Sequence, residues 1–219
     1  IIHHDIFVSV QSLPTSRRLP TFVPKGNMDE VVDVVLQRLS DGSWIERRDA
    51  LIVLMLYACG LRLAELCNID LSDFDNDFTA LRVLGKGDKT RIVPLVGRVS
   101  HEVKRYLAQN FEENICLSGE NALFLSKRGE RISRSDVQRS VARLLRECGV
   151  QGKCSPHVLR HTFATHLLND GADLREIQEL MGHSSLSATQ VYTHNNIAQL
   201  QRIYSTAHPR SVGESSDRL

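Results

Sequence analysis

The longest apolar run of this chain, residues 50–59, limits the folds that the chain can adopt. Its letters, ALIVLMLYAC, are apolar on every side of a helix, so a helix made of them has to be enclosed by other parts of the protein. The run is much shorter than the roughly 20 apolar residues that cross a bilayer. We therefore expect a buried helix over residues 45–59, ended by Gly60, and no membrane span.

The rest of the pattern predicts further helices around one β-hairpin. The segments LRVL at 81–84 and RIVPL at 91–95 flank the glycine-containing segment 85–89, which indicates an antiparallel hairpin. A short strand is expected at 123–125. Other helices are expected from after Asn27 to Leu39 and at 62–67, 99–110, 135–148, 156–171, 174–181, 186–192 and 197–206. The predicted fold class is therefore α+β, predominantly helical, with a small antiparallel sheet.

Local signals predict where two of these helices begin. Glu30 follows Asn27 by three residues, which is the spacing of a capping box. Ser155 and Pro156 are an expected N-cap and first helical residue. Both signals precede apolar residues at helical spacing, so they predict amphipathic helices that start at these points.

The two ends of the chain differ from this pattern. Residues 1–24 hold three prolines and show no helical period, which predicts a linker or arm. Residues 208–219 are polar, which predicts a disordered tail. We expect one domain over residues 25–207 between them. Because the first residue is not Met, we also expect the chain to be a fragment of a longer protein.

Charge is segregated along the chain, although the net charge is only +1. Residues 127–160 hold nine Lys or Arg against three Asp or Glu, and residues 82–105 hold seven against two. Such segments are commonly solvated faces, yet their separation from the acidic stretches favours a basic groove of the kind that binds nucleic acid. If that nucleic acid is double-stranded DNA, the candidate contacts are Lys89, Arg91, Arg134 and Arg139.

The cysteines indicate a reducing compartment. There are five of them, an odd number, and no two have C-x-x-C spacing. This argues against a disulfide framework and against a structural zinc site. We expect a cytoplasmic protein.

Basic residues and a tyrosine in the last third of the chain predict a phosphate site. His157 and Arg160 are spaced i,i+3 and share a helix face, and His183 and Tyr192 follow. An arginine and imidazoles that converge can bind a phosphate, and a tyrosine delivered there can attack the phosphorus. His157 and His161 have a spacing that zinc ligands use, but no carboxylate is placed as a third ligand.

Two residues farther upstream would complete such a site. Arg62 begins a predicted helical turn, where the helix dipole also favours an anion. Lys86 lies in the hairpin turn, from which a lysine can protonate a leaving 5′-alkoxide, and Lys89 is its rival. Taken singly, these side chains have simpler interpretations: a surface ion pair of Arg62 with Glu65, a solvated lysine, a helix cap at His183 and a half-buried core tyrosine.

Five motifs resemble, in family order, the catalytic domain of the tyrosine recombinases. They are GLRLAEL at 60–66, GKGDKTR at 85–91, HVLRHTFATH at 157–166, LMGH at 180–183 and TQVYTH at 189–194. The resemblance is nearest to the bacterial Xer and integrase branch and covers about residues 19–209. No single motif is specific, but the ordered set is.

The resemblance implies a site-specific DNA recombinase that cleaves and rejoins strands through a 3′-phosphotyrosine, without metal, cofactor or ATP. Its arginines and histidines would bind the scissile phosphate, its lysine would be the general acid and its tyrosine the nucleophile. The implied catalytic residues are Arg62, Lys86, His157, Arg160, His183 and Tyr192, with Glu65 in a supporting position.

The resemblance also implies an assembly. Family members act as tetramers that exchange a C-terminal helix, here about residues 195–206, so we expect a homotetramer, or a heterotetramer with a related recombinase, on DNA. Nothing in the sequence matches the N-terminal core-binding domain of that branch, and residues 1–24 correspond to its interdomain linker. Two alternatives stay open: a type IB topoisomerase-like enzyme that relaxes DNA, and a non-catalytic DNA-binding regulator of the same fold.

Overall fold

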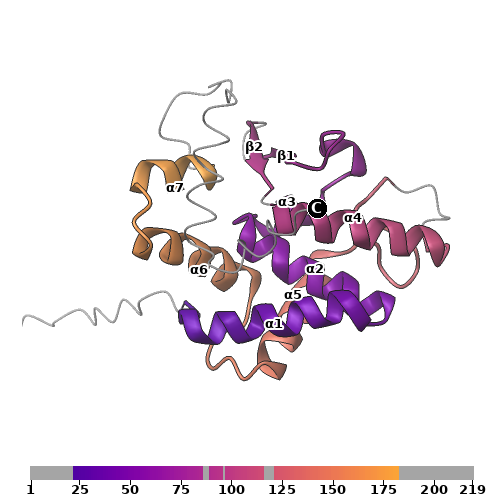
Figure 1. Ribbon diagram of the computed structural model, residues 1–219, viewed down its shortest axis with the longest axis horizontal. Helices are drawn as coiled ribbons and strands as arrows, with labels where there is room; N and C mark the ends of the chain where they lie inside the picture. Colours follow the sequence, from indigo (N-terminus) through magenta and orange to yellow (C-terminus); the bar gives the residue numbers. More distant parts are fainter. Residues whose placement is uncertain (1–21, 86–88, 96, 116–120, 183–219) are drawn as a thin grey trace, which may run out of the picture.

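The computed structural model describes residues 22–85, 89–95, 97–115 and 121–182, and in these residues helices surround α2 beside one two-stranded sheet (Figure 1). The elements in chain order are α1 (Lys25–Asp41), α2 (Trp44–Ala58), α3 (Leu63–Cys67), the 3₁₀ turn η1 (Leu71–Asp73), β1 (Ala80–Leu84), β2 (Thr90–Pro94), α4 (Gly97–Glu112), α5 (Arg134–Glu147), α6 (Pro156–Asn169) and α7 (Leu174–Leu180). The predicted mainly helical fold class and the hairpin are confirmed.

The core forms around α2, as the apolar run predicts. Every residue from Arg47 to Ala58 is buried, because α1, α4, α5 and α6 pack against this helix. The helix begins with a capping box in which the Ser43 N–H donates to Glu46 Oε2 at 2.9 Å. Its enclosure removes the apolar side chains from water, which is the main force that holds these helices together. None of the described helices is long and apolar enough to cross a membrane.

The first helix, α1, begins earlier than expected. It starts at Lys25, and the Pro24 carbonyl accepts a hydrogen bond from the Met28 N–H at 2.9 Å. The predicted capping box of Asn27 and Glu30 is therefore wrong. Proline has no N–H that needs a partner, and its φ, here −56°, already suits the start of a helix. The helix therefore begins after Pro24, and Asn27 lies inside its first turn.

The two strands form the predicted hairpin beside α3 (Figure 1). They pair antiparallel, from Ala80 opposite Pro94 to Leu84 opposite Thr90. Arg91 lies opposite Val83 in this register, and both side chains are buried. The hairpin thus turns one charged side chain inward, toward the helices.

The prediction of a strand at residues 123–125 is wrong. The segment makes only isolated bridges, Asp70 with Ala122 and Leu125 with Arg131. Because the two partners belong to different loops, no continuous ladder of hydrogen bonds forms. Residues 122–125 are nevertheless buried and fill part of the core.

The last three described helices agree with the predicted ones. α5 begins after Ser133, whose Oγ accepts from the Asp136 N–H at 3.1 Å. α6 begins at Pro156 as predicted, but the Ser155 side chain makes no capping hydrogen bond. α6 and α7 lie side by side at one end of the molecule (Figure 1). The helices expected at 186–192 and 197–206, the polar tail and residues 1–21 of the arm lie outside the described residues.

Candidate active site

The turn between α2 and α3 places the first candidate residue, Arg62. Gly60 has φ +57° in this turn, a left-handed conformation that glycine adopts without strain. The Arg62 backbone N–H donates to Glu65 Oε2 at 2.7 Å, and its Nη1 donates to Oε1 at 2.7 Å. The ion pair is not a simple surface pair, because the Arg62 side chain is 35% exposed and that of Glu65 only 4%.

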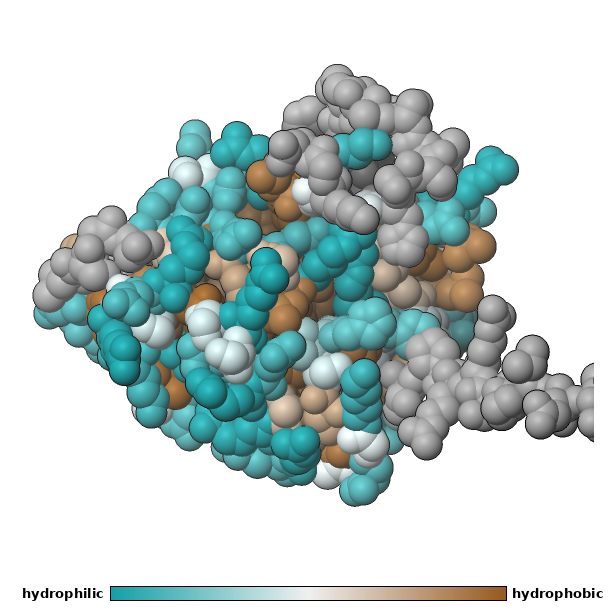
Figure 2. All heavy atoms as spheres, turned by 180° about the vertical axis from the view of Figure 1, so that it is seen from behind, coloured by the Kyte–Doolittle hydropathy of each residue, from teal (hydrophilic) through white to brown (hydrophobic). Residues whose placement is uncertain are grey.

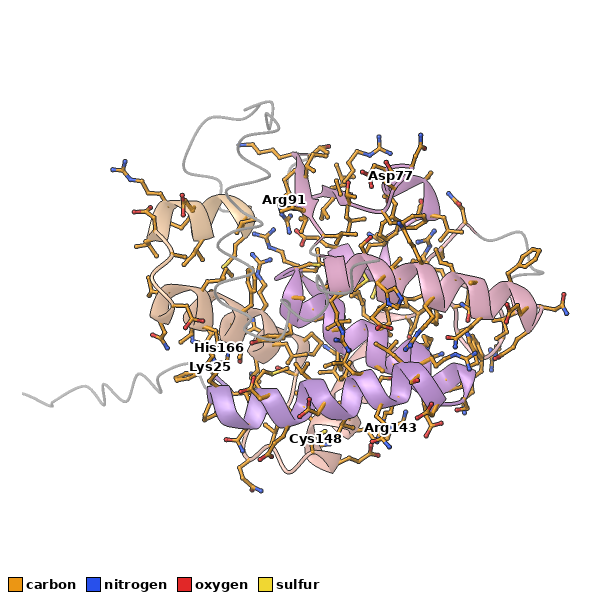
Figure 3. All side chains as sticks on the ribbon, in the orientation of Figure 1. Lys25, Asp77, Arg91, Arg143, Cys148 and His166 are labelled. Atoms are coloured by element: carbon orange, nitrogen blue, oxygen red, sulfur yellow. The ribbon has the colours of Figure 1, made fainter. Side chains whose placement is uncertain are left out.

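The hairpin contributes a second arginine to the same carboxylate. Arg91 Nη1 and Nη2 donate to the two oxygens of Glu65, each at 2.8 Å. Figure 3 shows Arg91 between the hairpin and α7. Burial by itself raises the pKa of Glu65, but the hydrogen bonds and charge of Arg91, with those of Arg62, lower that pKa to about 2. Glu65 is therefore ionised at neutral pH.

The third arginine, Arg160, comes from α6. Its Nη1 donates to the Gly60 carbonyl and its Nη2 to the Met181 carbonyl, the latter at 2.5 Å. Its Nη1 also lies 3.9 Å from Glu65 Oε2. Burial and the charge of Arg62 lower the pKa of Arg160 to about 10, against the opposite effect of Glu65. Arg160 therefore stays protonated at neutral pH.

These arginines also hold the C-terminal end of α7. Three consecutive carbonyls each accept from a different guanidinium group: Leu180 from Arg91 at 3.0 Å, Met181 from Arg160 at 2.5 Å, and Gly182 from Arg62 at 3.0 Å. The last carbonyls of a helix lack partners within it and carry partial negative charge, so cations suit them. Residues 180–182 are thus held at the arginine cluster.

The composition of this cluster favours an anion as its ligand. Among the described residues it contains three guanidinium groups, from Arg62, Arg91 and Arg160, around the single carboxylate of Glu65. Positive charge is therefore in excess, and guanidinium groups have the donor geometry that phosphate oxygens accept. The cluster is suited to bind a phosphate on the side where Arg62 is exposed.

His157 lies on the first turn of the helix that carries Arg160. Its side chain is exposed, and i,i+3 spacing puts it on the same face as Arg160. Burial and the nearby His157 lower the pKa of His161, which is half-buried. Among the described residues, no group of three or more His, Cys, Asp or Glu side chains has the arrangement of a metal site.

The remaining predicted catalytic residues, Lys86, His183 and Tyr192, lie outside the described residues. Their neighbours in the sequence are described. Gly85 and Lys89 flank residues 86–88, and Gly182 precedes His183. The structure therefore brings together Arg62, Glu65 and Arg160, with His157 on the same helix as Arg160, and leaves the other three as predictions.

Arg91 has a different position from that expected of a DNA contact. Only 8% of its side chain is exposed, and its guanidinium nitrogens donate to Glu65 and Leu180. The geometry favours a role inside the cluster, which sequence reasoning missed. Strand alternation could have indicated the burial of Arg91. Arg91 lies two residues before Val93, which is fully buried, so both side chains point to the same face of β2.

A separate basic surface lies near the opposite end of α2. A cleft of about 730 Å³ is lined by the start of α2, the loop at 126–133 and α5. Its charged side chains are Arg48, Asp49, Lys127, Arg128, Glu130, Arg131, Asp136, Arg139 and Arg143. Cations outnumber carboxylates in this lining, and Arg134 is exposed at the start of α5. Figure 2 shows the side turned away in Figure 1, where hydrophilic side chains cover most of the described surface.

Comparison with known families gives one match over most of the chain. Residues 28–199 match the phage integrase family. The chain is 42% identical over 202 residues to the tyrosine recombinase XerC of Rhizobium meliloti (strain 1021), which covers 90% of this chain and 62% of that relative. It is 40% identical over 206 residues to the XerC of Thermodesulfovibrio yellowstonii, covering 92% of this chain and 67% of the relative.

A solved recombinase structure has a similar fold. The fold is similar to that of the XerA recombinase, with a TM-score of 0.66 and 28% identity over 94% of this chain and 65% of that one. The chain thus spans about two thirds of the length of the relatives that it matches.

Proposed function

The chain belongs to the phage integrase family, and on that premise we propose that it is the catalytic part of a site-specific DNA recombinase. It cleaves and rejoins DNA through a 3′-phosphotyrosine intermediate and needs no metal ion, cofactor or ATP. Two relatives that are at least 40% identical to it carry the name tyrosine recombinase, which supports this proposal.

The arginine cluster around Glu65 is the observation that carries the proposal. Arg62 and Arg160 come from distant parts of the sequence, yet both lie within 4 Å of this one carboxylate. A phosphodiester has one negative charge in the ground state and more charge on its oxygens as the phosphorus is attacked. Preorganised guanidinium groups stabilise that added charge without having to reorganise.

The proposed chemistry uses the predicted catalytic residues. The Tyr192 oxygen attacks the phosphorus while its proton passes to His157. The bond to the 5′-oxygen breaks, and Lys86 gives that oxygen its proton, with Lys89 as the rival donor. His157 and His183 donate hydrogen bonds to the phosphate. A phosphotyrosine ester retains the free energy of the original diester, so a 5′-hydroxyl of a second strand can attack it and restore the DNA.

The basic cleft is a candidate surface for the DNA beyond the cleavage point. Arg139 lines the cleft and Arg134 lies at the start of the same helix, α5. Lysine and arginine side chains bind DNA mainly through its phosphates, which position the duplex without reading its sequence. In this proposal Lys89, Arg134 and Arg139 contact DNA, whereas Arg91 acts within the active site.

The active assembly is a tetramer of this recombinase, or one shared with a related recombinase, on two DNA sites. Residues 195–206, which lie outside the described part of the chain, supply the exchanged helix. Their apolar residues Ile197, Leu200 and Ile203 recur at helical spacing. Such a stripe needs an apolar surface to cover it, and the neighbouring subunit provides one.

A covalent trap tests this function. The chain is incubated with a library of nicked duplexes whose central sequence is randomised. After cleavage beside the nick, the short strand diffuses away and the protein stays bound to DNA. We expect adducts that survive denaturation, and the recovered DNA should share a common sequence.

Other outcomes would favour the alternatives. Binding of the library without any adduct would indicate a DNA-binding regulator. Relaxation of supercoiled plasmid by the chain alone, with no shared sequence among the adducts, would indicate a topoisomerase. Either result contradicts the proposed recombinase.

A further inference from the structure

Arg91 is placed to control what Glu65 does. Its guanidinium group binds both oxygens of Glu65 at 2.8 Å. We propose that Arg91 is a positioning residue: it occupies the Glu65 carboxylate, so that Arg62 and Arg160 keep guanidinium N–H groups for the phosphate. This inference rests on the proposed function, in which Arg62 and Arg160 bind the scissile phosphate.

The hydrogen bonds at Glu65 are divided unequally among the three arginines. Arg91 makes the only two-point pair of side chains, whereas Arg62 reaches the carboxylate with Nη1 alone, at 2.7 Å. Arg160 comes no closer than 3.9 Å. The two arginines assigned to the phosphate are therefore the two whose guanidinium groups make the fewest hydrogen bonds to Glu65.

Without Arg91, the carboxylate would be free to change partner. A two-point pair between a guanidinium group and a carboxylate is stronger and more directional than a single bond. Arg62 is already bonded to Glu65 and is the nearest candidate for such a pair. A pair of that kind would use the N–H groups that face the phosphate and would neutralise the charge that attracts it.

Arg91 cannot act on DNA directly. Its side chain is 8% exposed, and its Nε is bonded to the Leu180 carbonyl at 3.0 Å. Two indirect routes remain: control of Glu65, or simple support of the end of α7 through Leu180. The two routes predict different results once the carboxylate is removed.

A double-mutant cycle with inorganic phosphate as the probe separates them. The variants are R91M, E65Q and R91M/E65Q, and NMR follows the Nε–H signals of Arg62 and Arg160 as phosphate is added. We expect R91M to weaken phosphate binding about tenfold, which is within the usual range for coupled sites. E65Q should bind at least as tightly as the wild type, and the double variant should stay within about twofold of E65Q.

Three checks separate an effect on phosphate binding from an effect on folding. The free energy of unfolding of each variant is measured first, and R91K, which retains the charge but not the two-point geometry, should bind phosphate with intermediate affinity. R47M is the matched control, because Arg47 is similarly buried at 7% exposure and its ion pair, with Glu113, lies at the other end of α2. R47M should lower stability and leave phosphate binding unchanged.

The inference is overturned if R91M weakens phosphate binding equally with and without Glu65, since that result assigns Arg91 to the support of α7. Unchanged binding in R91M overturns it too. Failure of the proposed function has a different signature: the phosphate cycle behaves as expected, but the wild-type chain forms no covalent adduct with DNA.

Discussion

Gly60 lies directly against the ring of Phe163, so that a Cβ at position 60 would be 2.5 Å from two of its ring carbons. Gly60 belongs to the turn before Arg62, and Phe163 lies one helical turn after Arg160 on α6. The Gly60 carbonyl also accepts a hydrogen bond from Arg160. This close approach of two segments is what brings the two candidate phosphate-binding arginines together.

Alanine at position 60 should therefore be strongly destabilising. G60A adds a Cβ to a residue with φ +57° and pushes it into Phe163, so we expect a loss of more than about 2 kcal/mol in the free energy of unfolding. Urea unfolding measures this loss. The control is G26A in α1, where the added Cβ meets no atom within 4 Å; it should stabilise the protein by about 0.5–1 kcal/mol. Similar effects of the two substitutions would contradict this account.

Glu65 should make the protein sensitive to acid. Its pKa is lowered to about 2 in the folded protein from an ordinary value of 4.5. The unfolded chain therefore binds a proton first as the pH falls, so the stabilisation from Glu65 is complete above pH 4.5 and is lost down to pH 2. E65Q should be less stable than the wild type at pH 7, and the difference should shrink as the pH falls through this window. A difference that stays constant with pH would be evidence against it.

His166 should give a second pH dependence, near neutral pH. It lies between two buried partners, with Nδ1 2.9 Å from Tyr57 Oη and Nε2 3.0 Å from the Val23 carbonyl. Burial lowers the pKa of His166, with a smaller contribution from Lys25, against the effect of Val23. Protonation thus favours the unfolded chain, and stability should decline as the pH falls below about 6.5.

The measurement for this prediction compares the wild type with H166Q. Urea unfolding at pH 7.5 and at pH 5.5 should show a smaller loss of stability on acidification in H166Q. Glutamine can still donate to the Val23 carbonyl but does not titrate. An equal loss in both proteins would mean that other groups cause the pH dependence.

Arg139 in the cleft and Arg134 at the start of the same helix should contribute to DNA affinity through phosphates. R134Q and R139Q should each weaken binding of a random-sequence duplex, and each should reduce the slope of log K against log salt by about one. Fluorescence anisotropy over a salt series measures both effects. R38Q is the matched control, because Arg38 is paired with a carboxylate, Glu147, as Arg139 is with Asp136, but does not line the cleft. If R38Q lowers the slope as much as R139Q, the cleft has no special role.

Much of the fold could be predicted because its signals are local. The apolar run forced a buried helix, and Pro156 marked the start of α6. The start of α1 was mispredicted because Pro24 and Asn27 both suit a helix N-terminus, and only the packing of the whole helix selects between them. The false strand at 123–125 is buried like a strand but lacks one continuous partner, and no local pattern shows that.

The candidate site was predictable to a lesser extent. Motif spacing was enough to single out Arg62 and Arg160, whose side chains the fold brings to Glu65. Arg91 was grouped with the DNA contacts because it lies in a basic segment. Its pairing with Glu65, 26 residues earlier, depends on how the hairpin docks on α3. Such a contact follows from tertiary packing, which residue types alone do not specify.

The residue that carries the DNA in the covalent adduct identifies the nucleophile. The adduct from the covalent trap is digested with trypsin, and mass spectrometry locates the nucleotide on the peptide. We predict that the modified peptide lies between Arg175 and Arg202, that the modified residue is Tyr192, and that Y192F forms no adduct. A nucleotide on any other residue, or an adduct that persists in Y192F, would contradict the account.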